Sequence, residues 1–411
     1  MSIRKEFVMR VLAKEAPVTE LCRRYGISRK TGYKWIGRFH EQGVSGLVDE
    51  SRRPHSSPEA TSDAEAQEII ALRQRHTRWG ARKLHRLLEQ RHGDATPSLA
   101  TVARVLERAG LLRRRKRRAS PRGVVGAKPN VLVEAANDLW TVDFKGWWKT
   151  RDGQRCNPLT VRDAHSRYVL ALELVEDMSA VSVRRVFEKL FDTFGVPKAI
   201  QSDNGQPFAS VTSLGGLTKL SAWWVALGIA LVRSRPGCPQ DNGGHERMHA
   251  DIRREIQATR ASNVEAQQRI CDNWRAEFNH IRPHEALDMR TPRELYTPSP
   301  IRPQMRHGYV RAECVERVVD RRGFLGVDGE TIYISTALAE HTIGLWKQGP
   351  VTSVWLCDLY IGAFMPGLDK SVQPHPLEAL RGLSGQSKQP KGRSRPTREV
   401  TRGGHSKRRE G

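Results

Sequence analysis

The sequence lacks the long apolar runs of a membrane protein. No stretch of the 411 residues approaches the run of about 18 apolar residues that a membrane helix needs. The N-terminus, MSIRKEFVMRVLAKEAPVTE, also lacks the apolar block of a secretory signal. We therefore expect a cytosolic protein without a membrane partner.

Paired cysteines are missing as well. None of the six cysteines belongs to a C-x-x-C pair, which argues against both a zinc knuckle and a disulfide framework. We interpret them as small buried apolar residues. They are Cys22, Cys156, Cys238, Cys271, Cys314 and Cys357.

Acidic residues are scarce at the two ends of the chain. Residues 1–130 carry 29 Lys and Arg against 13 Asp and Glu, and residues 371–411 carry 10 against 3. The 240 residues between them are almost balanced, with 30 basic against 29 acidic residues. Basic ends around an acid-balanced centre are typical of a protein that binds a polyanion and holds a metal site, because Lys and Arg displace counterions from phosphates. Charge alone is equally compatible with a merely soluble basic protein.

The length and the changes of pattern along the chain predict several domains. We expect a multidomain fold, with N-terminal all-α helix-turn-helix modules, an α/β core and a small C-terminal β domain. The predicted segments are a helix-turn-helix domain (1–48), a linker (49–62), a second helical domain with a basic run (63–130), the α/β core (131–298), a β-rich domain (299–368) and a disordered basic tail (369–411).

The first 40 residues have the pattern of a helix-turn-helix. Apolar residues recur at helical spacing, Gly26 interrupts them, and Ser28 offers an N-cap to a second helix over 28–39. Trp35 and Ile36 of that helix can face inward. The polar side chains expected to face a DNA major groove are Arg29, Lys30, Thr31 and Lys34. A small helical bundle with a solvated basic face is the structural alternative.

A Ser- and Pro-rich linker precedes three further amphipathic helices, the last of them capped by Ser98. This unit can be a second DNA-reading module. It ends in a run of basic residues that suits a phosphate backbone or a minor groove. The same run can equally be an import-like signal or a solvated charge cluster. Its members are Arg113, Arg114, Arg115, Lys116, Arg117 and Arg118.

From about residue 138 the pattern changes to strands. LWTVDFKGW, NPLTVRDAHS and RYVLALELVE are close enough to pair as hairpins, and a helix over 180–194 follows them. Further short strands then alternate with helices near 217–228, 242–258 and 264–280. Three meandering strands followed by alternating elements indicate a mixed sheet covered by helices.

Three carboxylates stand out because each projects from an apolar frame. Asp143 lies in the middle of the first strand, Asp203 ends the strand KAIQSD, and Glu246 begins a helix after a Gly-rich loop. Singly they have structural explanations: an edge-strand aspartate, a turn former and a first-turn helix charge. Three separated carboxylates with neither a Cys nor a fixed His pair suit a hard cation such as Mg²⁺ or Mn²⁺ better than zinc.

In this order the residues resemble a known family. Trp140-Thr141-Val142-Asp143, Ser202-Asp203-Asn204-Gly205, and Pro239-Gln240-Asp241-Asn242-Gly243 running on to Glu246 are similar to motifs of the DDE transposases of bacterial insertion sequences. Asn279, Arg282, Pro283 and His284 resemble the Asn-x-x-Arg-Pro-His tail that follows such cores. The resemblance spans about residues 138–297 and implies the RNase H-like fold that these enzymes share with retroviral integrases.

The resemblance implies two Mg²⁺ or Mn²⁺ ions per active site, with Asp143 and Asp203 as shared ligands and Glu246 completing one shell. Water would free a 3′-hydroxyl at each element end, and this hydroxyl would attack target DNA. Residues expected to position double-stranded DNA or to support the ligands are Asn204, Gln240, Asn242, Arg247 and His249. We expect a homo-oligomer on DNA, in the cytoplasm of a bacterium and associated with the nucleoid.

The 42 residues between Asp203 and Glu246 depart from retroviral integrases, which have a shorter interval. Trp223 and Trp224 within it can form core for a longer helix or a surface on DNA, and we expect core. Two rivals remain for the function. One is a DNA-binding regulator or domesticated protein that kept the fold and lost the chemistry, and the other is a nuclease without strand joining.

Overall fold

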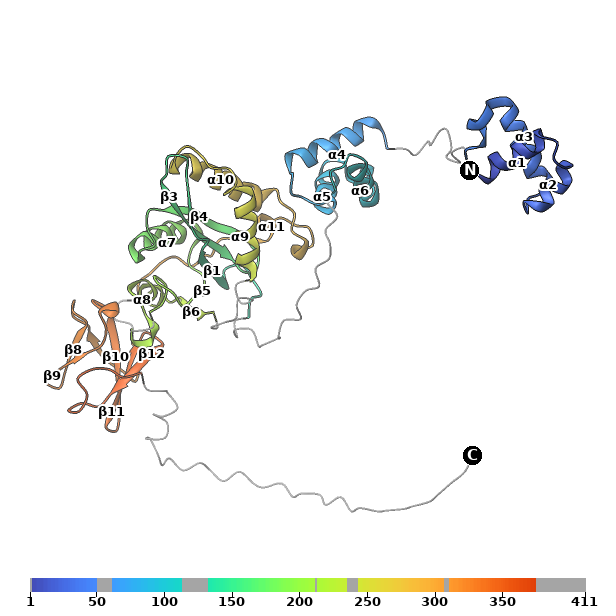
Figure 1. Ribbon diagram of the computed structural model, residues 1–411. Coiled ribbons are helices and arrows are strands. Elements are labelled where there is room, and N and C mark those ends of the chain that lie inside the picture. The colour runs from blue at the N-terminus through green and yellow to red at the C-terminus, as the bar shows by residue number, and fades with distance from the viewer. Residues whose placement is uncertain are drawn as a thin grey trace, which may run out of the picture. The chain divides into compact units, whose positions relative to one another are not determined.

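The computed structural model of the protein describes residues 2–49, 61–112, 132–210, 213–234, 243–306 and 310–374 (Figure 1). The chain divides into two compact units, residues 1–71 and 72–411, with the boundary inside helix α4 (Asp63–Arg75). Within these described ranges, no helix is both long and apolar enough to cross a membrane.

The first unit contains the predicted helix-turn-helix. Its helices are α1 (Ile3–Leu12), α2 (Val18–Arg24) and α3 (Arg29–Gln42), followed by a short 3₁₀ turn (Gly43–Leu47). Ser28 caps α3 as expected, because its side chain accepts a hydrogen bond from the Thr31 N–H at 3.1 Å. A Cβ on Gly32 would lie 2.5 Å from the Cys22 Sγ, so glycine allows α3 to pack closely on α2.

The second unit begins with the end of α4 and two amphipathic helices, α5 (Ala81–His92) and α6 (Leu99–Arg108). Ser98 caps α6 as expected, since its hydroxyl accepts from the Thr101 N–H at 3.2 Å. Leu84, Leu88 and Leu106 are fully buried, which is the consequence of the apolar stripes seen in the sequence.

A mixed sheet forms the centre of the second unit. Its strands are β1 (Leu139–Phe144), β2 (Trp148–Lys149), β3 (Arg155–Asp163), β4 (Val169–Val175), β5 (Ala199–Ser202) and β6 (Ala230–Arg233). Strand β3 pairs antiparallel with β1, β2 and β4, whereas β1, β5 and β6 run parallel. The meander followed by parallel strands confirms the predicted mixed sheet.

Helices cover both faces of this sheet (Figure 1). They are α7 (Ala180–Phe194), α8 (Lys219–Ala226), α9 (Gly243–Glu255), α10 (Val264–His280) and the short α11 (Pro292–Leu295). One core joins the sheet to α7 and α8 through Trp140, Phe187 and Trp224, and the other joins it to α9 and α10 through Trp148 and Met248.

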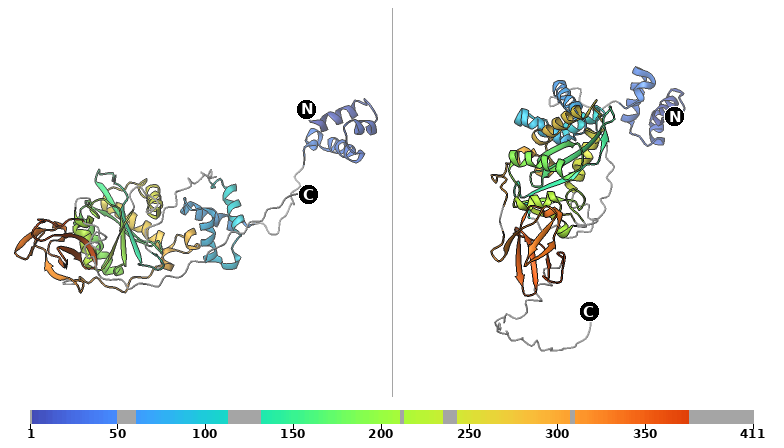
Figure 2. Two further views of the ribbon diagram at one scale, coloured as in Figure 1. Left: turned by 90° about the horizontal axis from the view of Figure 1, so that it is seen from below. Right: turned by 90° about the vertical axis from the view of Figure 1, so that its left-hand side faces the viewer.

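A strand-rich region follows, as the sequence predicted. Strands β7 (Val315–Val318), β10 (Thr342–Gln348), β11 (Val351–Leu356) and β12 (Leu359–Phe364) form an antiparallel sheet, and β8 (Phe324–Val327) pairs with β9 (Glu330–Tyr333). Its core includes Ala222 and Val225 of α8, so this helix packs between the central sheet and the β7–β12 region (Figure 2).

The cysteines are mostly buried, as expected. Cys22, Cys156, Cys271 and Cys357 are buried and unpaired. Cys314 departs from the prediction because it is only half-buried, and Cys238 lies outside the described residues.

The prediction that Trp223 and Trp224 form core is confirmed. Trp224 is completely buried, with its ring 4.8 Å from that of Phe187, and Trp223 is 6 % exposed. We predict that Trp224→Ala lowers the free energy of unfolding by about 3–5 kcal/mol, because the cavity cannot be filled by its rigid neighbours. Urea denaturation followed by circular dichroism measures this loss. Trp147→Ala is the control, since Trp147 is 55 % exposed, and an equal loss in both variants would contradict the assignment.

Candidate active site

Strand alternation places Asp143 on the face of the sheet that α9 covers. Trp140 and Val142 point into the core with α7, so Thr141 and Asp143 point the opposite way. Asp143 lies next to the end of β1, not in its middle, and is half-buried. Its register partner on β3 is Thr160, whose hydroxyl donates to the Asp143 backbone carbonyl at 2.9 Å.

Asp203 lies at the same edge of the sheet because β5 runs parallel to β1. Thr141 pairs with Gln201, so the chain leaves β5 beside the end of β1. The Gly205 N–H donates to the Asp203 Oδ1 at 3.2 Å, which makes a tight turn after the strand. The neighbouring Asn204 amide donates to the Ser234 carbonyl at 2.8 Å and so ties this turn to the end of β6.

Glu246 is an exposed residue in the first turn of α9. The opposite face of this helix carries His245, Met248 and Ile252, which are buried against the sheet. The helix therefore holds Glu246 at the border between the buried face of the sheet and the surface.

A network of threonines and histidines seats α9 on the sheet. His245 Nε2 is hydrogen-bonded to the Thr141 hydroxyl at 2.7 Å, and its Nδ1 lies 3.2 Å from the Thr160 hydroxyl. His249 Nε2 lies 2.9 Å from the same Thr160 oxygen. Because Thr160 donates its single proton to the carbonyl of Asp143, we assign both histidines as N–H donors to Thr160.

The three carboxylates share one electrostatic environment. Burial, together with the negative charges of Asp203 and Glu246, raises the pKa of Asp143 to about 6. No Lys or Arg among the described residues forms an ion pair with any of the three. The charge of Arg233 acts favourably on Asp203, but the site remains a concentration of carboxylates without an ion pair among the described residues, which favours a cation.

The three acids are not the tightest cluster of potential ligand atoms here. One potential ligand atom from each of Asp143, His245 and His249 lies within 4.8 Å of the other two. Burial lowers the pKa of His245 far below its ordinary value and that of His249 to about 4, so both are neutral at pH 7. Both ring nitrogens of His245 and the Nε2 of His249 are already hydrogen-bonded to threonines. The histidines are thus structural supports of α9, and the donors that fit a hard cation are the carboxylate oxygens.

The residues predicted to contact DNA occupy different environments. On α3, Arg29, Lys30 and Lys34 are exposed, whereas Thr31 is half-buried and its hydroxyl lies 2.9 Å from that of Ser28. The basic run Arg113 to Arg118, together with Gln240 and Asn242, lies outside the described residues.

Three predicted contacts flank the carboxylates. Arg247 is exposed beside Glu246, and Asn204 is exposed although its amide is bonded to Ser234. His249 is half-buried and holds α9 on the sheet, which corresponds to a supporting position.

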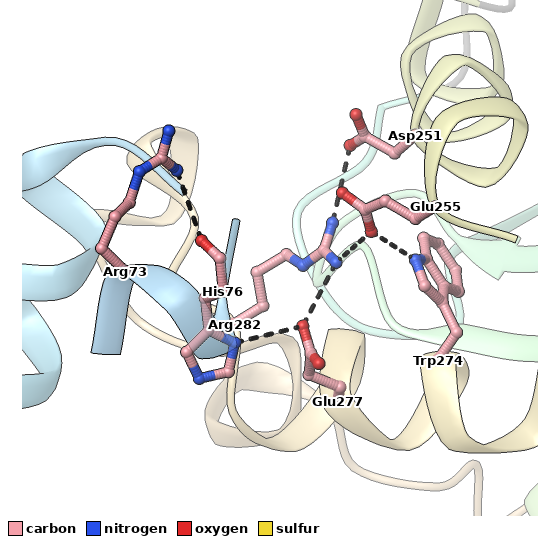
Figure 3. Close-up of polar contacts among 7 residues, drawn as sticks. All are labelled: Arg73, His76, Asp251, Glu255, Trp274, Glu277 and Arg282. Carbon is pink, nitrogen blue, oxygen red and sulfur yellow. Dashed lines mark hydrogen bonds and ion pairs between the residues drawn. The ribbon is translucent and has the colours of Figure 1, made fainter. Parts of the chain in front are cut away.

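Sequence reasoning placed Arg282 in the Asn-x-x-Arg-Pro-His motif but missed its structural role behind α9 (Figure 3). Arg282, only 3 % exposed, contacts Glu255 at 2.5 Å, Glu277 at 3.3 Å and Asp251 at 3.7 Å. Its guanidinium also lies over the rings of Trp274 and Trp79, 5.3 and 5.7 Å from their centroids. Asp251 and Glu255 belong to α9, so Arg282 fixes the rear of the helix that carries Glu246.

The same cluster reaches the helical module at the start of the second unit. His76 Nδ1 lies 3.8 Å from the Glu277 carboxylate (Figure 3). Arg73 donates to the Trp79 carbonyl at 2.8 Å and so holds the loop that carries His76 and Trp79. The signal for this cluster was the Asn-x-x-Arg-Pro-His motif, which marked a family but gave no contact.

Family models match the two kinds of module that the geometry distinguishes. A helix-turn-helix domain matches residues 3–55, and a homeodomain-like domain matches residues 31–106. Two models of an integrase core domain match residues 133–239 and 227–292. The region 3–55 includes all of α3, and the two integrase core regions together include all three carboxylates.

Relatives of similar sequence come from mobile elements. The chain is 27 % identical over 254 residues to an uncharacterized protein of insertion element IS476 from Xanthomonas euvesicatoria, covering 61 % of this chain and 70 % of that protein. It is also 27 % identical over 242 residues to an uncharacterized protein of insertion element IS407 from Burkholderia multivorans, covering 58 % of this chain and 83 % of the relative.

Among solved structures, the catalytic core domain of HTLV-2 integrase in complex with magnesium is similar to this chain. The TM-score is 0.32 at 14 % sequence identity, over 40 % of this chain and 98 % of that one.

We predict that Arg282→Met lowers the free energy of unfolding by about 3–5 kcal/mol, because three carboxylates lose their common buried partner. Arg282→Lys should lose less free energy of unfolding than Arg282→Met. It should remain less stable than the wild type, because an ammonium group cannot replace a planar guanidinium that also stacks on two indoles. Urea denaturation measures both losses. The control is Arg269→Met on α10, which breaks only an exposed pair with Glu265. Equal stability of Arg282→Met and Arg269→Met would contradict the role of Arg282.

Proposed function

The chain carries an integrase core domain behind helix-turn-helix modules and belongs with the insertion-element proteins, and from this relationship we propose that it is a transposase. It would cut DNA at the ends of its own element and join these ends to target DNA. Asp143, Asp203 and Glu246 would be its catalytic carboxylates.

The observation that carries this proposal is the electrostatic coupling of three acids from distant parts of the chain. Burial and the charges of Asp203 and Glu246 act together on the carboxyl of Asp143, and no described cationic side chain is paired with any of the three. Holding three carboxylates together without an ion pair costs free energy, and packing alone gives no reason for such an arrangement. A site that binds divalent cations in its working state gives a reason for this arrangement.

We propose Mg²⁺ or Mn²⁺ as the cofactor, two ions per site. Such a pair supplies activation of the attacking oxygen and stabilisation of the leaving oxygen in a displacement at phosphorus. Asp143 and Asp203 would be shared ligands, and Glu246 would complete one shell.

The chain's own residues would then orient the strand. In the first reaction a water oxygen forms a bond to phosphorus while the bond to the 3′-oxygen breaks, which leaves a 3′-hydroxyl and a 5′-phosphate. In the second, this hydroxyl attacks a target phosphate and one target 3′-oxygen leaves. One phosphodiester bond forms for each bond that breaks in the joining step, so no external energy source is needed.

The DNA-binding modules would bring the ends to this site. Arg29, Lys30 and Lys34 are exposed on α3, the second helix of the helix-turn-helix, which is the element that enters a major groove in this motif. Two element ends must be held together for joining, so the working form would be a homo-oligomer on double-stranded DNA.

A DNA-binding regulator without chemistry and a nuclease without joining are the alternatives. Incubation of the purified protein with Mg²⁺ and a labelled duplex of the element end separates all three. A transposase gives joined products, a nuclease gives nicked DNA only, and a regulator leaves the duplex intact.

We predict that Asp203→Asn and Glu246→Gln each lower cleavage of end DNA by more than about 100-fold, since even residues behind metal ligands contribute 10–100-fold. DNA affinity should change little, because the modules that bind the ends are elsewhere. Cleavage is measured on denaturing gels and affinity by fluorescence anisotropy. Glu265→Gln, which removes an exposed carboxylate of α10, is the control. Full cleavage by either site variant would remove that residue from the mechanism.

We also predict a steep salt dependence of DNA binding. The slope of log affinity against log salt should be about −0.9 for each phosphate neutralised, so a triple variant Arg29→Ala, Lys30→Ala, Lys34→Ala should flatten it by up to about 2.7. Titrations over a series of salt concentrations measure the slope. Lys189→Ala on α7 should leave it unchanged. A triple variant with the wild-type slope would show that α3 is not on DNA.

A further inference from the structure

Arg162 is a buried arginine whose guanidinium has no hydrogen-bond or ion-pair partner among the described residues. It lies on β3 opposite Thr141, on the face that carries Asp143, and is only 8 % exposed. No described residue forms an ion pair or a side-chain hydrogen bond with its guanidinium, and its Nε is buried without an acceptor. Native proteins rarely leave a buried charge in this state unless it serves a function.

Other arginines among the described residues have acceptors for part of their guanidinium, although the Nε atoms of Arg282 and Arg86 are also buried without one. Arg282 contacts three carboxylates, and Arg233 donates to the Ser202 hydroxyl and the Phe208 carbonyl at 3.0 and 2.9 Å. The nearest acid to Arg162 in sequence is Asp163, but its carboxylate accepts instead from the Asn137 N–H and the Ser166 N–H, each at 2.7 Å. Among the described residues, the Arg162 guanidinium thus has no hydrogen-bond acceptor, although the negative charge of Asp163 acts favourably on it.

The guanidinium of Arg162 points at the first turn of α9. A Cβ on Gly244 would lie 2.5 Å from its Nη1 and 2.8 Å from its Cζ, so only glycine lets the helix pass over it. Gly244 is exposed, and the turn is therefore open to a ligand. The N–H groups of a first helical turn have no partner within the helix and attract anions.

Two further arginines add positive charge at the same place. The charge of Arg167 acts unfavourably on Arg162, and that of Arg247 acts unfavourably on Arg167. The positive charges of Arg162, Arg167 and Arg247 thus act on one another near the first turn of α9, the turn that carries Glu246. A cluster of this kind is stable only when an anion or solvent compensates it.

We propose that Arg162, beside Gly244 at the first turn of α9, binds one phosphodiester group of a DNA strand that enters the active site. The proposal rests on the proposed function, because that function supplies the strand. Arg162 would be a positioning residue: it fixes one phosphate by a charge-assisted hydrogen bond, so that another phosphate of the same strand reaches the carboxylates.

A phosphate scan tests this proposal on the full-length protein. Single methylphosphonate groups, which lack the charge, replace successive phosphates in a duplex of the element end and in a target duplex, and binding is measured without divalent cations. One substitution should weaken wild-type binding by about tenfold, as expected for one charged hydrogen bond. The same substitution should have no effect on Arg162→Met, whose affinity for unmodified DNA is already lower by the same factor.

Gly244→Ala provides a second test with a matched neighbour. The added methyl group would displace the guanidinium, so this variant should bind DNA about as weakly as Arg162→Met. A Cβ on Gly243 meets no atom within 4 Å, so Gly243→Ala should bind like the wild type. Equal affinity of both alanine variants would contradict the proposal.

Stability separates phosphate binding from a structural role. Removal of an unpaired buried charge should leave the melting temperature of Arg162→Met equal to or above that of the wild type in the absence of DNA. A lower melting temperature with unchanged DNA affinity would overturn the proposal and make Arg162 a structural residue. If no phosphate in either duplex is specific to Arg162, the proposal is also wrong, whereas failure of the wild type to cleave end DNA would instead overturn the proposed function.

Discussion

The seating of α9 on the sheet is the constraint on which the site depends. Asp143 and Asp203 come from adjacent parallel strands, so the sheet alone brings them to one edge. Strand pairing does not position Glu246, because this residue belongs to a helix from a later part of the chain. His245, held between the Thr141 and Thr160 hydroxyls, fixes the height and rotation of that helix. A neutral imidazole can do this at a buried position where a charged group would need a counterion.

Two arginines show opposite uses of buried charge around the same helix. Arg282 lies behind α9 in contact with three carboxylates and two indoles, and these contacts hold the rear of the helix in place (Figure 3). Arg162 lies below the first turn of α9 without an acceptor among the described residues, so its guanidinium is available to bind an anion. The rear of α9 is thus held by Arg282, whereas Arg162 near its first turn has no ion-pair partner among the described residues. This pattern is expected at a site where stability is sacrificed for binding.

Short sequence patterns predicted the helices and strands correctly, because the interactions that form these elements involve residues close together in the sequence. The apolar spacing of α7 and α10 and the hydroxyl caps at Ser28 and Ser98 depend on neighbours within a few residues. The three acids were recognisable through motif order. The roles of Arg162 and Arg282 were not, because they depend on contacts with residues distant in sequence. Gly244 is 82 positions from Arg162, and Glu255 is 27 positions from Arg282. A sequence does not state whether a buried arginine has found an acceptor.

The long interval between Asp203 and Glu246 illustrates how a sequence distance can grow without disturbing a site. Strand β5 fixes one end of the interval, and the histidine-seated α9 fixes the other. The inserted helix α8 buries Trp224 against the sheet and Val225 against the β7–β12 region, so its two faces contribute to two cores. The interval between Asp203 and Glu246 therefore also connects the central sheet to the strand-rich region through α8. We relate the length of the interval to this packing and not to the spacing of the carboxylates.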